Sequence, residues 1–143
     1  MIITTSELLA NSDFQLHFRD GLSNIDKNEK MDFLIKFTKE LKGAFENHHL
    51  KIEHIAKHIA LSERQLYRHS KQYLKLTPGN FLQRYRLEKS INKIKQGNAL
   101  GNISYEVGFS SHSYFCRCFK EKFGDTPSMF IEYLNHARRS NND

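Results

Sequence analysis

The 143-residue chain has few of the residues that crosslink, kink or interrupt a fold: two cysteines, two prolines, seven glycines and no tryptophan. Two cysteines are too few for a disulfide scaffold. No apolar run is long enough to cross a bilayer. The N-terminus lacks the basic start and the long apolar core of a secretory signal. We therefore expect a cytoplasmic protein, with no membrane contact from this chain.

The sequence also lacks the residue constellations that carry catalysis. No Ser-His-Asp order, pair of carboxylates or glycine-rich phosphate loop stands out, so we expect neither an enzyme nor a cofactor. His54 and His58 have the i, i+4 spacing of a metal-binding pair. However, EHIAKH lacks the glutamate of HExxH, and no third ligand is evident. A solvated helix face is the better interpretation, and no metal site is predicted.

Two cysteines lie one residue apart in GFSSHSYFCRCFKEKFGDTP, residues 108–127. On a helix, such positions point about 200° apart and cannot share one metal ion. We expect Cys118 to be a small buried hydrophobe and Cys116 to face outward, toward a ligand. A reactive thiolate at Cys116, favoured by Arg117, is the weaker alternative, because most free cysteines are inert.

The net charge of +6 is unevenly distributed. Residues 1–50 carry a net charge of −2, and residues 51–143 carry +8. A strongly basic segment favours a polyanionic partner, most often nucleic acid. Ordinary solubility charge is the alternative, and charge alone does not choose between them.

Apolar residues recur at helical spacing almost throughout, and no convincing strand pattern is present, so the predicted fold is all-α. Residues 1–31 read as an irregular lead-in, and a helix is predicted to begin near Asp32. The apolar stripe of that helix is Phe33, Leu34, Phe37, Leu41 and Phe45. Further helices are expected over about 52–59, 63–74, 78–97, 98–107, 112–123 and 127–134, with a frayed C-terminal end.

One unit of sequence occurs twice. A shift of 48 residues aligns the apolar residues of 52–61 with those of 100–109. A shift of 49 aligns Leu66, Arg68, Lys71, Thr77 and Pro78 with Phe115, Arg117, Lys120, Thr126 and Pro127. A short helix, a tight turn and a serine-capped helix form the helix-turn-helix pattern. Two copies joined by a long helix predict a homeodomain-like pair of subdomains.

The second helix of each copy has a core stripe and a basic face. The expected core stripes are Leu66, Tyr73 and Leu74 in the first copy and Phe115, Phe119 and Phe123 in the second. Arginine can bind guanine O6 and N7 with two hydrogen bonds, and Ser, His and Tyr can reach base edges or phosphates. A single basic face is usually only solvated. Two copies with matched Arg and Lys positions favour DNA binding.

At residues 105–130 the sequence YEVGFSSHSYFCRCFKEKFGDTPSMF resembles the signature of AraC/XylS-type bacterial transcription regulators, within their C-terminal DNA-binding region. The resemblance extends over about residues 32–134 and is weaker in the first copy, IAKHIALSERQLYRHSKQYLKLTPGNFLQRYRL (55–87). The entry segment from Met31 to Arg68 also resembles that of output domains in hybrid two-component sensors. We expect the chain to be a piece of a larger protein more than a single-domain regulator.

This resemblance implies a lead-in or linker at 1–31, a first subdomain at 32–97 that includes a linker helix at about 78–97, and a second subdomain at 98–137. The two recognition helices would enter successive major grooves of promoter DNA, about 34 Å apart. RNA polymerase is a further expected partner, and the expected state is a monomer or weak dimer. The expected base-reading residues are Arg64, Tyr67, Arg68, His112, Ser113, Cys116 and Arg117. The expected phosphate contacts or caps are Ser62, Lys71, Arg86, Ser111 and Lys120.

Four residues depart from the family pattern. Ala60 and Lys75 replace turn glycines, Ser70 replaces an apolar core residue, and Ser104 replaces alanine. These changes are predicted to weaken the packing of the first unit more than its DNA-facing side. Two alternatives to a regulator remain: a helical module whose basic face binds an acidic protein, and the DNA-binding module of a larger DNA-modifying enzyme.

Overall fold

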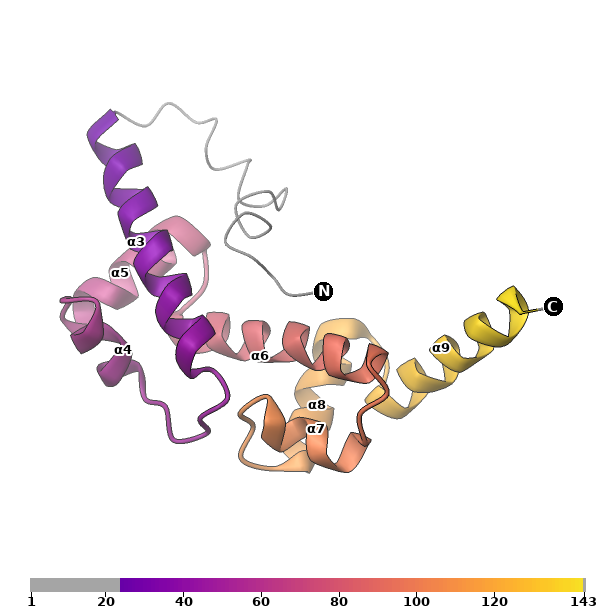
Figure 1. Cartoon of the computed structure of the whole chain (residues 1–143). Helices are drawn as coiled ribbons and strands as arrows, with labels where there is room; N and C mark the ends of the chain where they lie inside the picture. Colours follow the sequence, from indigo (N-terminus) through magenta and orange to yellow (C-terminus); the bar gives the residue numbers. More distant parts are fainter. Residues whose placement is uncertain (1–23, 143) are drawn as a thin grey trace. The chain divides into compact units, whose positions relative to one another are not determined.

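The computed structural model describes residues 24–142. This part of the chain folds into seven helices and contains no strand, which confirms the predicted all-α class (Figure 1). None of the seven is both long and apolar enough to cross a membrane. The helices are α3 (Asn24–Ala44), α4 (Ile52–His58), α5 (Glu63–Leu74), α6 (Pro78–Lys95), α7 (Leu100–Glu106), α8 (His112–Phe123) and α9 (Pro127–Asn141).

The described residues form two compact units. The first contains residues 24–45 and 49–83, and the second contains residues 46–48 and 84–142. Each unit holds one helix-turn-helix pair, α4–α5 in the first and α7–α8 in the second. Helix α6 contributes to both units, whereas the sequence-based division placed all of it in the first subdomain.

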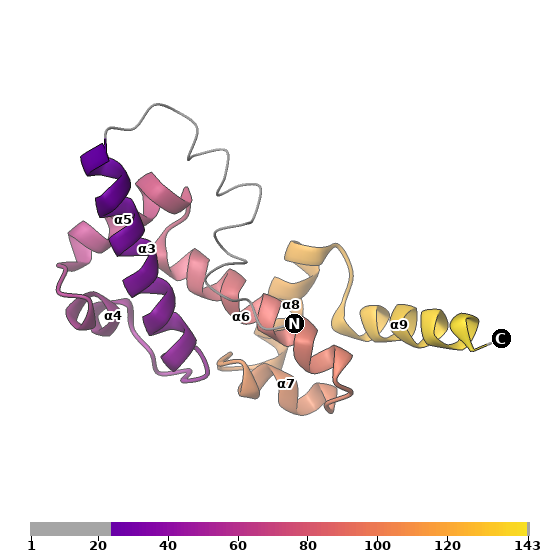
Figure 2. The ribbon, with the colours of Figure 1, turned by 45° about the horizontal axis from the view of Figure 1, so that its top comes forward.

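In the first unit α3 packs against both α4 and α5, as the two views of the ribbon show (Figures 1 and 2). All five residues of its predicted apolar stripe are buried, and the Phe33 and Phe37 rings stack 5.2 Å apart. Leu66 and Tyr73 of α5 complete this core, as predicted, while Leu74 is only half-buried. The helix-turn-helix pair of this unit therefore rests on a third helix.

The expected start of that third helix near Asp32 is wrong, because α3 begins at Asn24. The predicted lead-in therefore overlaps α3, and its first 23 residues lie outside the described part of the chain. Residues 24–31 contain no apolar stripe, which is why periodicity missed them. This segment nevertheless has tertiary contacts: Lys30 is only 2% exposed, and Glu29 Oε1 lies 3.8 Å from His69 Nε2 on α5.

In the second unit a row of aromatic rings lies under α8. Phe109, Phe115 and Phe119 are buried, with centroids 5.2 Å apart for the first pair and 5.8 Å for the second. Phe123 was expected in this core but is 37% exposed, because it lies in the last turn of α8 and contacts the core on one side, through Phe119.

Helix α9 is longer than the sequence suggested. Fraying was expected from Ala137 onward, but α9 continues to Asn141. The Arg138 guanidinium donates a hydrogen bond of 2.8 Å to the backbone carbonyl of Lys95, at the end of α6. This bond satisfies one of the carbonyls that a helix end leaves without an intrahelical partner. It also anchors the last turn of α9, whose sequence has no apolar periodicity that would predict a helix.

The tight turns of the two units have the same backbone shape but different residues. Ala60 and Lys75 have φ angles of 58° and 61°, and the equivalent Gly108 and Gly124 have 94° and 88°. A side chain in this left-handed region costs about 1–2 kcal/mol, and glycine avoids that cost. The first unit therefore holds two strained turns that the second unit avoids, in agreement with the departures noted in its sequence.

Ser70 shows how the first unit accommodates one of its substitutions. Its equivalent in the second unit is the buried Phe119, and Ser70 is itself fully buried. The Ser70 hydroxyl donates a hydrogen bond of 2.7 Å to the carbonyl of Leu76. Because Leu76 directly follows Lys75, this bond supports the strained end of α5.

Replacing Lys75 with glycine is expected to stabilise the protein by about 0.5–1 kcal/mol, since relief of the left-handed strain exceeds the extra backbone entropy of the unfolded chain. Urea denaturation followed by circular dichroism measures the change. Lys75→Gln removes the same charge but keeps the strain, so it isolates the backbone effect. Gly124→Ala, where a Cβ meets open space, should destabilise by about 1 kcal/mol. A less stable Lys75→Gly variant would contradict the strain argument.

His69 should make the stability of the protein depend on pH. It is 7% exposed and lies between the edges of Phe33 and Tyr73. Burial lowers its pKa below the usual value, with Glu29 opposing and Arg68 reinforcing the shift. Because the unfolded chain then binds the proton more readily, this contribution to stability is complete above pH about 6.5 and is lost as the pH falls toward the folded-state pKa.

The comparison of wild type with His69→Phe isolates this contribution, because the other seven histidines are present in both proteins. We expect the free energy of unfolding of the wild type to fall more steeply than that of His69→Phe between pH 7.5 and pH 5. Parallel curves would show that His69 is not the group responsible.

Candidate nucleic-acid interface

Each candidate recognition helix begins at a serine cap. Ser62 Oγ accepts a hydrogen bond of 3.1 Å from the Gln65 backbone N–H, and the Ser62 backbone N–H donates one of 2.9 Å to Gln65 Oε1. Ser111 Oγ accepts one of 3.1 Å from the Tyr114 N–H. Both predicted caps are confirmed, and they define the first residues that each helix can present to a ligand.

The outward face of α5 matches the prediction closely. Arg64, Tyr67, Arg68 and Lys71 are all exposed, Tyr67 to 52%. The opposite face buries Leu66, His69, Ser70 and Tyr73. Packing of that buried face directs three cations and a phenol ring away from the core, on two turns of one helix.

The outward face of α8 is narrower than the sequence suggested. Ser113, Arg117 and Lys120 are exposed, but His112 and Cys116 are half-buried. The Cys116 sulfur lies 3.4 Å from His112 Nε2, and the His112 ring packs against Phe115 at 6.1 Å. These two side chains contact each other and the core edge, which leaves less of their surface for base reading than was expected.

The environment of the cysteines opposes the thiolate alternative. Burial raises the pKa of the Cys116 thiol above its usual value, so the neutral form is favoured at neutral pH. Cys118 is 4% exposed, which confirms its assignment as a small core residue.

Arg86 of α6 has a structural contact in the second unit. Its guanidinium donates a hydrogen bond of 2.9 Å to the carbonyl of Asn47, in the segment that follows α3. Burial lowers the pKa of Arg86, and the nearby Tyr114 opposes that shift. The Arg86 side chain therefore already holds the segment 46–48, and a phosphate contact, which was expected from the sequence, would be an additional role.

Sequence reasoning missed the partner of Arg117. The Arg117 guanidinium lies over the Tyr114 ring, with its central carbon 5.2 Å from the ring centroid. Tyr114 also contacts Phe109 edge-on at 5.8 Å, so its ring packs against the edge of the core on that side. The i, i+3 spacing of Tyr114 and Arg117 on one helix was the available signal.

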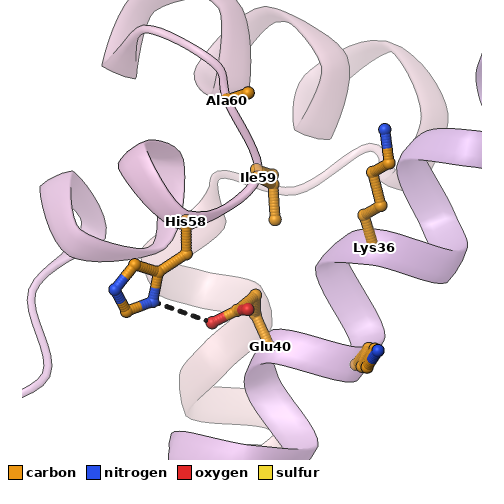
Figure 3. Close-up of a pocket in the computed structure, with 6 residues that line it drawn as sticks. Lys36, Glu40, His58, Ile59 and Ala60 are labelled. Carbon is orange, nitrogen blue, oxygen red and sulfur yellow. Dashed lines mark hydrogen bonds and ion pairs between the residues drawn. The ribbon is translucent and has the colours of Figure 1, made fainter.

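Of the two histidines of α4, His58 lines a cavity and His54 lies outside it. A cavity of about 250 Å³ between α3 and the α4–α5 turn is lined by Lys36, Lys39, Glu40, His58, Ile59 and Ala60 (Figure 3). His58 Nδ1 lies 3.1 Å from Glu40 Oε2 across it, and His54 lies 3.7 Å from Glu53. No group of three potential metal ligands occurs in residues 24–142. Both histidines are exposed and paired with carboxylates.

Comparison with known proteins identifies the architecture. A family described as "Helix-turn-helix domain" matches residues 55–133. Histidine kinase P4 of Formosa agariphila is 29% identical over 110 residues, which are 76% of this chain and 8% of that protein. The transcriptional activator RhaS of Mannheimia succiniciproducens is 35% identical over 77 residues, 52% of this chain and 28% of that protein. The chain thus spans less than a third of the length of these curated relatives.

Solved structures of other proteins have the same fold. An AraC-type transcriptional regulator from Chromobacterium violaceum superposes with a TM-score of 0.65 at 27% identity, covering 74% of this chain and 92% of that chain. The C-terminal domain of AraT, a response regulator from Geobacillus stearothermophilus, has the same fold, with a TM-score of 0.66 at 22% identity over 71% of this chain and 84% of that chain.

The fold and the two capped basic helices define a tandem helix-turn-helix DNA-binding domain. The chain belongs to the AraC/XylS-type transcription regulators, and it corresponds to their C-terminal DNA-binding region.

Proposed function

We propose that this chain is the DNA-binding output region of a larger transcription regulator and that α5 and α8 enter successive major grooves of promoter DNA, about 34 Å apart. The observation that carries the proposal is the equivalence of the two helices. Arg68 and Arg117 occupy matched positions, as do Lys71 and Lys120, and all four are exposed on capped helices whose opposite faces are buried.

The exposure and the hydrogen bonds of each side chain indicate which residues read bases, which contact phosphates and which cap a helix. Arg64, Tyr67 and Arg68 on α5, and Ser113 and Arg117 on α8, are the exposed candidates for reading base edges. His112 and Cys116 would contribute from the edge of the interface. Lys71 and Lys120, a turn further along each helix, suit phosphate contacts, which supply affinity rather than sequence information. The hydroxyls of Ser62 and Ser111 act first as caps.

The relatives indicate the kind of protein to which such a region belongs. One is named a histidine kinase, and solved neighbours are described as domains of response regulators, one of them a two-component response regulator. We propose that the region serves a two-component system in the cytoplasm, binds DNA as a monomer or weak dimer, and contacts RNA polymerase. Catalysis, where the larger protein has it, would lie outside this region.

Binding to a random-sequence duplex should fall steeply with salt. We expect the logarithm of the association constant to decrease linearly with the logarithm of salt concentration, with a slope of about −4 or steeper, because each phosphate contact releases counterions. Fluorescence anisotropy between about 50 and 200 mM salt measures the slope. A lysine-rich protein of similar net charge but no helix-turn-helix is the control. Absence of binding at low salt would overturn the proposal and favour an acidic protein partner.

Arg117→Ala and Lys120→Ala should have different effects on a site selected from a random library. Loss of Arg117 is expected to cost about 1–3 kcal/mol on the selected site and to relax the preference at one base pair. Loss of Lys120 should weaken all sequences alike and reduce the salt slope by about one. Competition anisotropy with single-base variants separates these outcomes. An equal loss on selected and random DNA for Arg117→Ala would make it a phosphate contact.

A further inference from the structure

The two equivalent arginines have different surroundings. On α8, the guanidinium of Arg117 lies over the ring of Tyr114, one turn earlier on the same helix. On α5, the position equivalent to Tyr114 is Gln65, whose side chain is used in the capping box of Ser62. No aromatic ring within residues 24–142 contacts Arg68. Within the described residues, the recognition arginine of the second unit is therefore supported by a ring, and that of the first is not.

The Tyr114 ring is itself fixed from the core side. Its edge contact with Phe109 connects it to the buried Phe115, which lies 5.2 Å from Phe109. The backbone N–H of Tyr114 donates to the Ser111 cap. Tyr114 nevertheless remains 39% exposed, so one part of the side chain is held by the core and another part reaches the outer surface of α8. A ring held in this way can fix the position of a side chain that stacks on it.

Stacking matters for arginine because its side chain is long and loses rotamer entropy on binding. A guanidinium that already lies on an aromatic face has lost part of that freedom in the unbound protein, and it keeps its N–H groups available at its edge. Those N–H groups are the donors that a bidentate contact with guanine O6 and N7 requires. Preorganisation of this kind lowers the cost of binding and penalises misaligned partners.

We propose that Tyr114 is a positioning residue that sets the base specificity of Arg117. The inference rests on the proposed function. It predicts that the two halves of the DNA site differ in base preference. The preference should be strict at the base pair read by Arg117 and weak at the base pair read by Arg68. The chemistry recognised at the strict position is the two-acceptor edge of guanine, formed by O6 and N7.

Two substitutions separate the parts of the Tyr114 side chain. Tyr114→Phe keeps the ring under Arg117 and removes the hydroxyl, which is the only hydrogen-bonding group of the side chain and lies near Arg86. Tyr114→Leu removes the ring and keeps a bulky apolar group for Phe109. Operator selection from a random duplex library, followed by competition anisotropy with single-base variants, gives the preference at each position. Arg117→Ala identifies which base pair Arg117 reads.

At that base pair, we compare the affinity for the best base with the affinity for the worst base. Tyr114→Leu is expected to reduce this affinity ratio by about two- to fivefold, the range that corresponds to an exposed cation–π contact. Tyr114→Phe should keep the wild-type ratio. Affinity for random DNA and the salt slope should be unchanged in both variants, and a purely structural role for Tyr114 would instead lower affinity at every position. The preference lost in Arg68→Ala should be smaller than that lost in Arg117→Ala.

Three outcomes would overturn the proposal. An unchanged ratio in Tyr114→Leu would show that the ring does not position Arg117. A loss of preference in Tyr114→Phe as well would identify the hydroxyl, not the ring, as the specificity group. Equal strictness at the base pairs read by Arg68 and Arg117 would remove the predicted asymmetry. A wild-type protein that does not bind DNA would instead refute the proposed function.

A measurement on the free protein tests directly whether Tyr114 restrains the Arg117 side chain, without any need for DNA. In NMR spectra of the free wild-type protein, the side-chain resonances of Arg117 should show a ring-current shift and restricted motion that Arg68 lacks. Both should persist in Tyr114→Phe and disappear in Tyr114→Leu. Equal mobility of the two arginines in the wild type would contradict the proposal whether or not the variants fold or bind DNA.

Discussion

Burial of one face of a short helix is the constraint on which the rest of each unit depends. Helices α5 and α8 each contain 12 residues, a length at which an isolated helix is only marginally stable in water. Their stability and their orientation must therefore come from packing. Because Leu66 and Tyr73 fix one side of α5, and Phe115 and Phe119 one side of α8, the basic residues at the intervening positions are directed outward.

The two units meet this constraint with different residues. The second unit places glycine in its tight turns and a row of phenylalanines under α8. The first unit has Ala60 and Lys75 in left-handed conformations and a serine where the second has Phe119. Helix α3, whose apolar stripe packs on α4 and α5, supplies Phe33 and Phe37 to a core in which α5 buries the single aromatic residue Tyr73 beside His69. The additional helix compensates for turns and a core that are individually less favourable.

The sequence was sufficient for features with local or repeated causes. The apolar periods, the serine caps and the two Thr-Pro helix starts appear in the structure where they were predicted: Ser62 and Ser111 cap α5 and α8, and Thr77 and Thr126 accept hydrogen bonds at the starts of α6 and α9. These features depend on residues at most four apart, so a single sequence contains all the information they need.

Features with nonlocal causes could not be predicted in the same way. The first turns of α3 are polar and contact α5 through Glu29 and His69, and the end of α9 is held by the bond from Arg138 to Lys95. The half-burial of His112 and Cys116 likewise follows from how deeply α8 sits on its own core, which periodicity does not measure. Helical spacing gives the direction of a side chain, whereas exposure depends on the neighbouring elements.

The same distinction applies to recognition. Arg68 and Arg117 are equivalent by sequence, by position in the repeat and by exposure, so residue identity alone would assign them equal roles. Their neighbours one turn earlier differ, because Gln65 is committed to a helix cap and Tyr114 carries the guanidinium on a ring held by Phe109. A duplicated scaffold can therefore present the same side chain twice with different degrees of freedom. Since discrimination between bases depends on how far a donor can adjust to the wrong partner, we expect the surroundings of an arginine to add to the specificity that the arginine itself supplies.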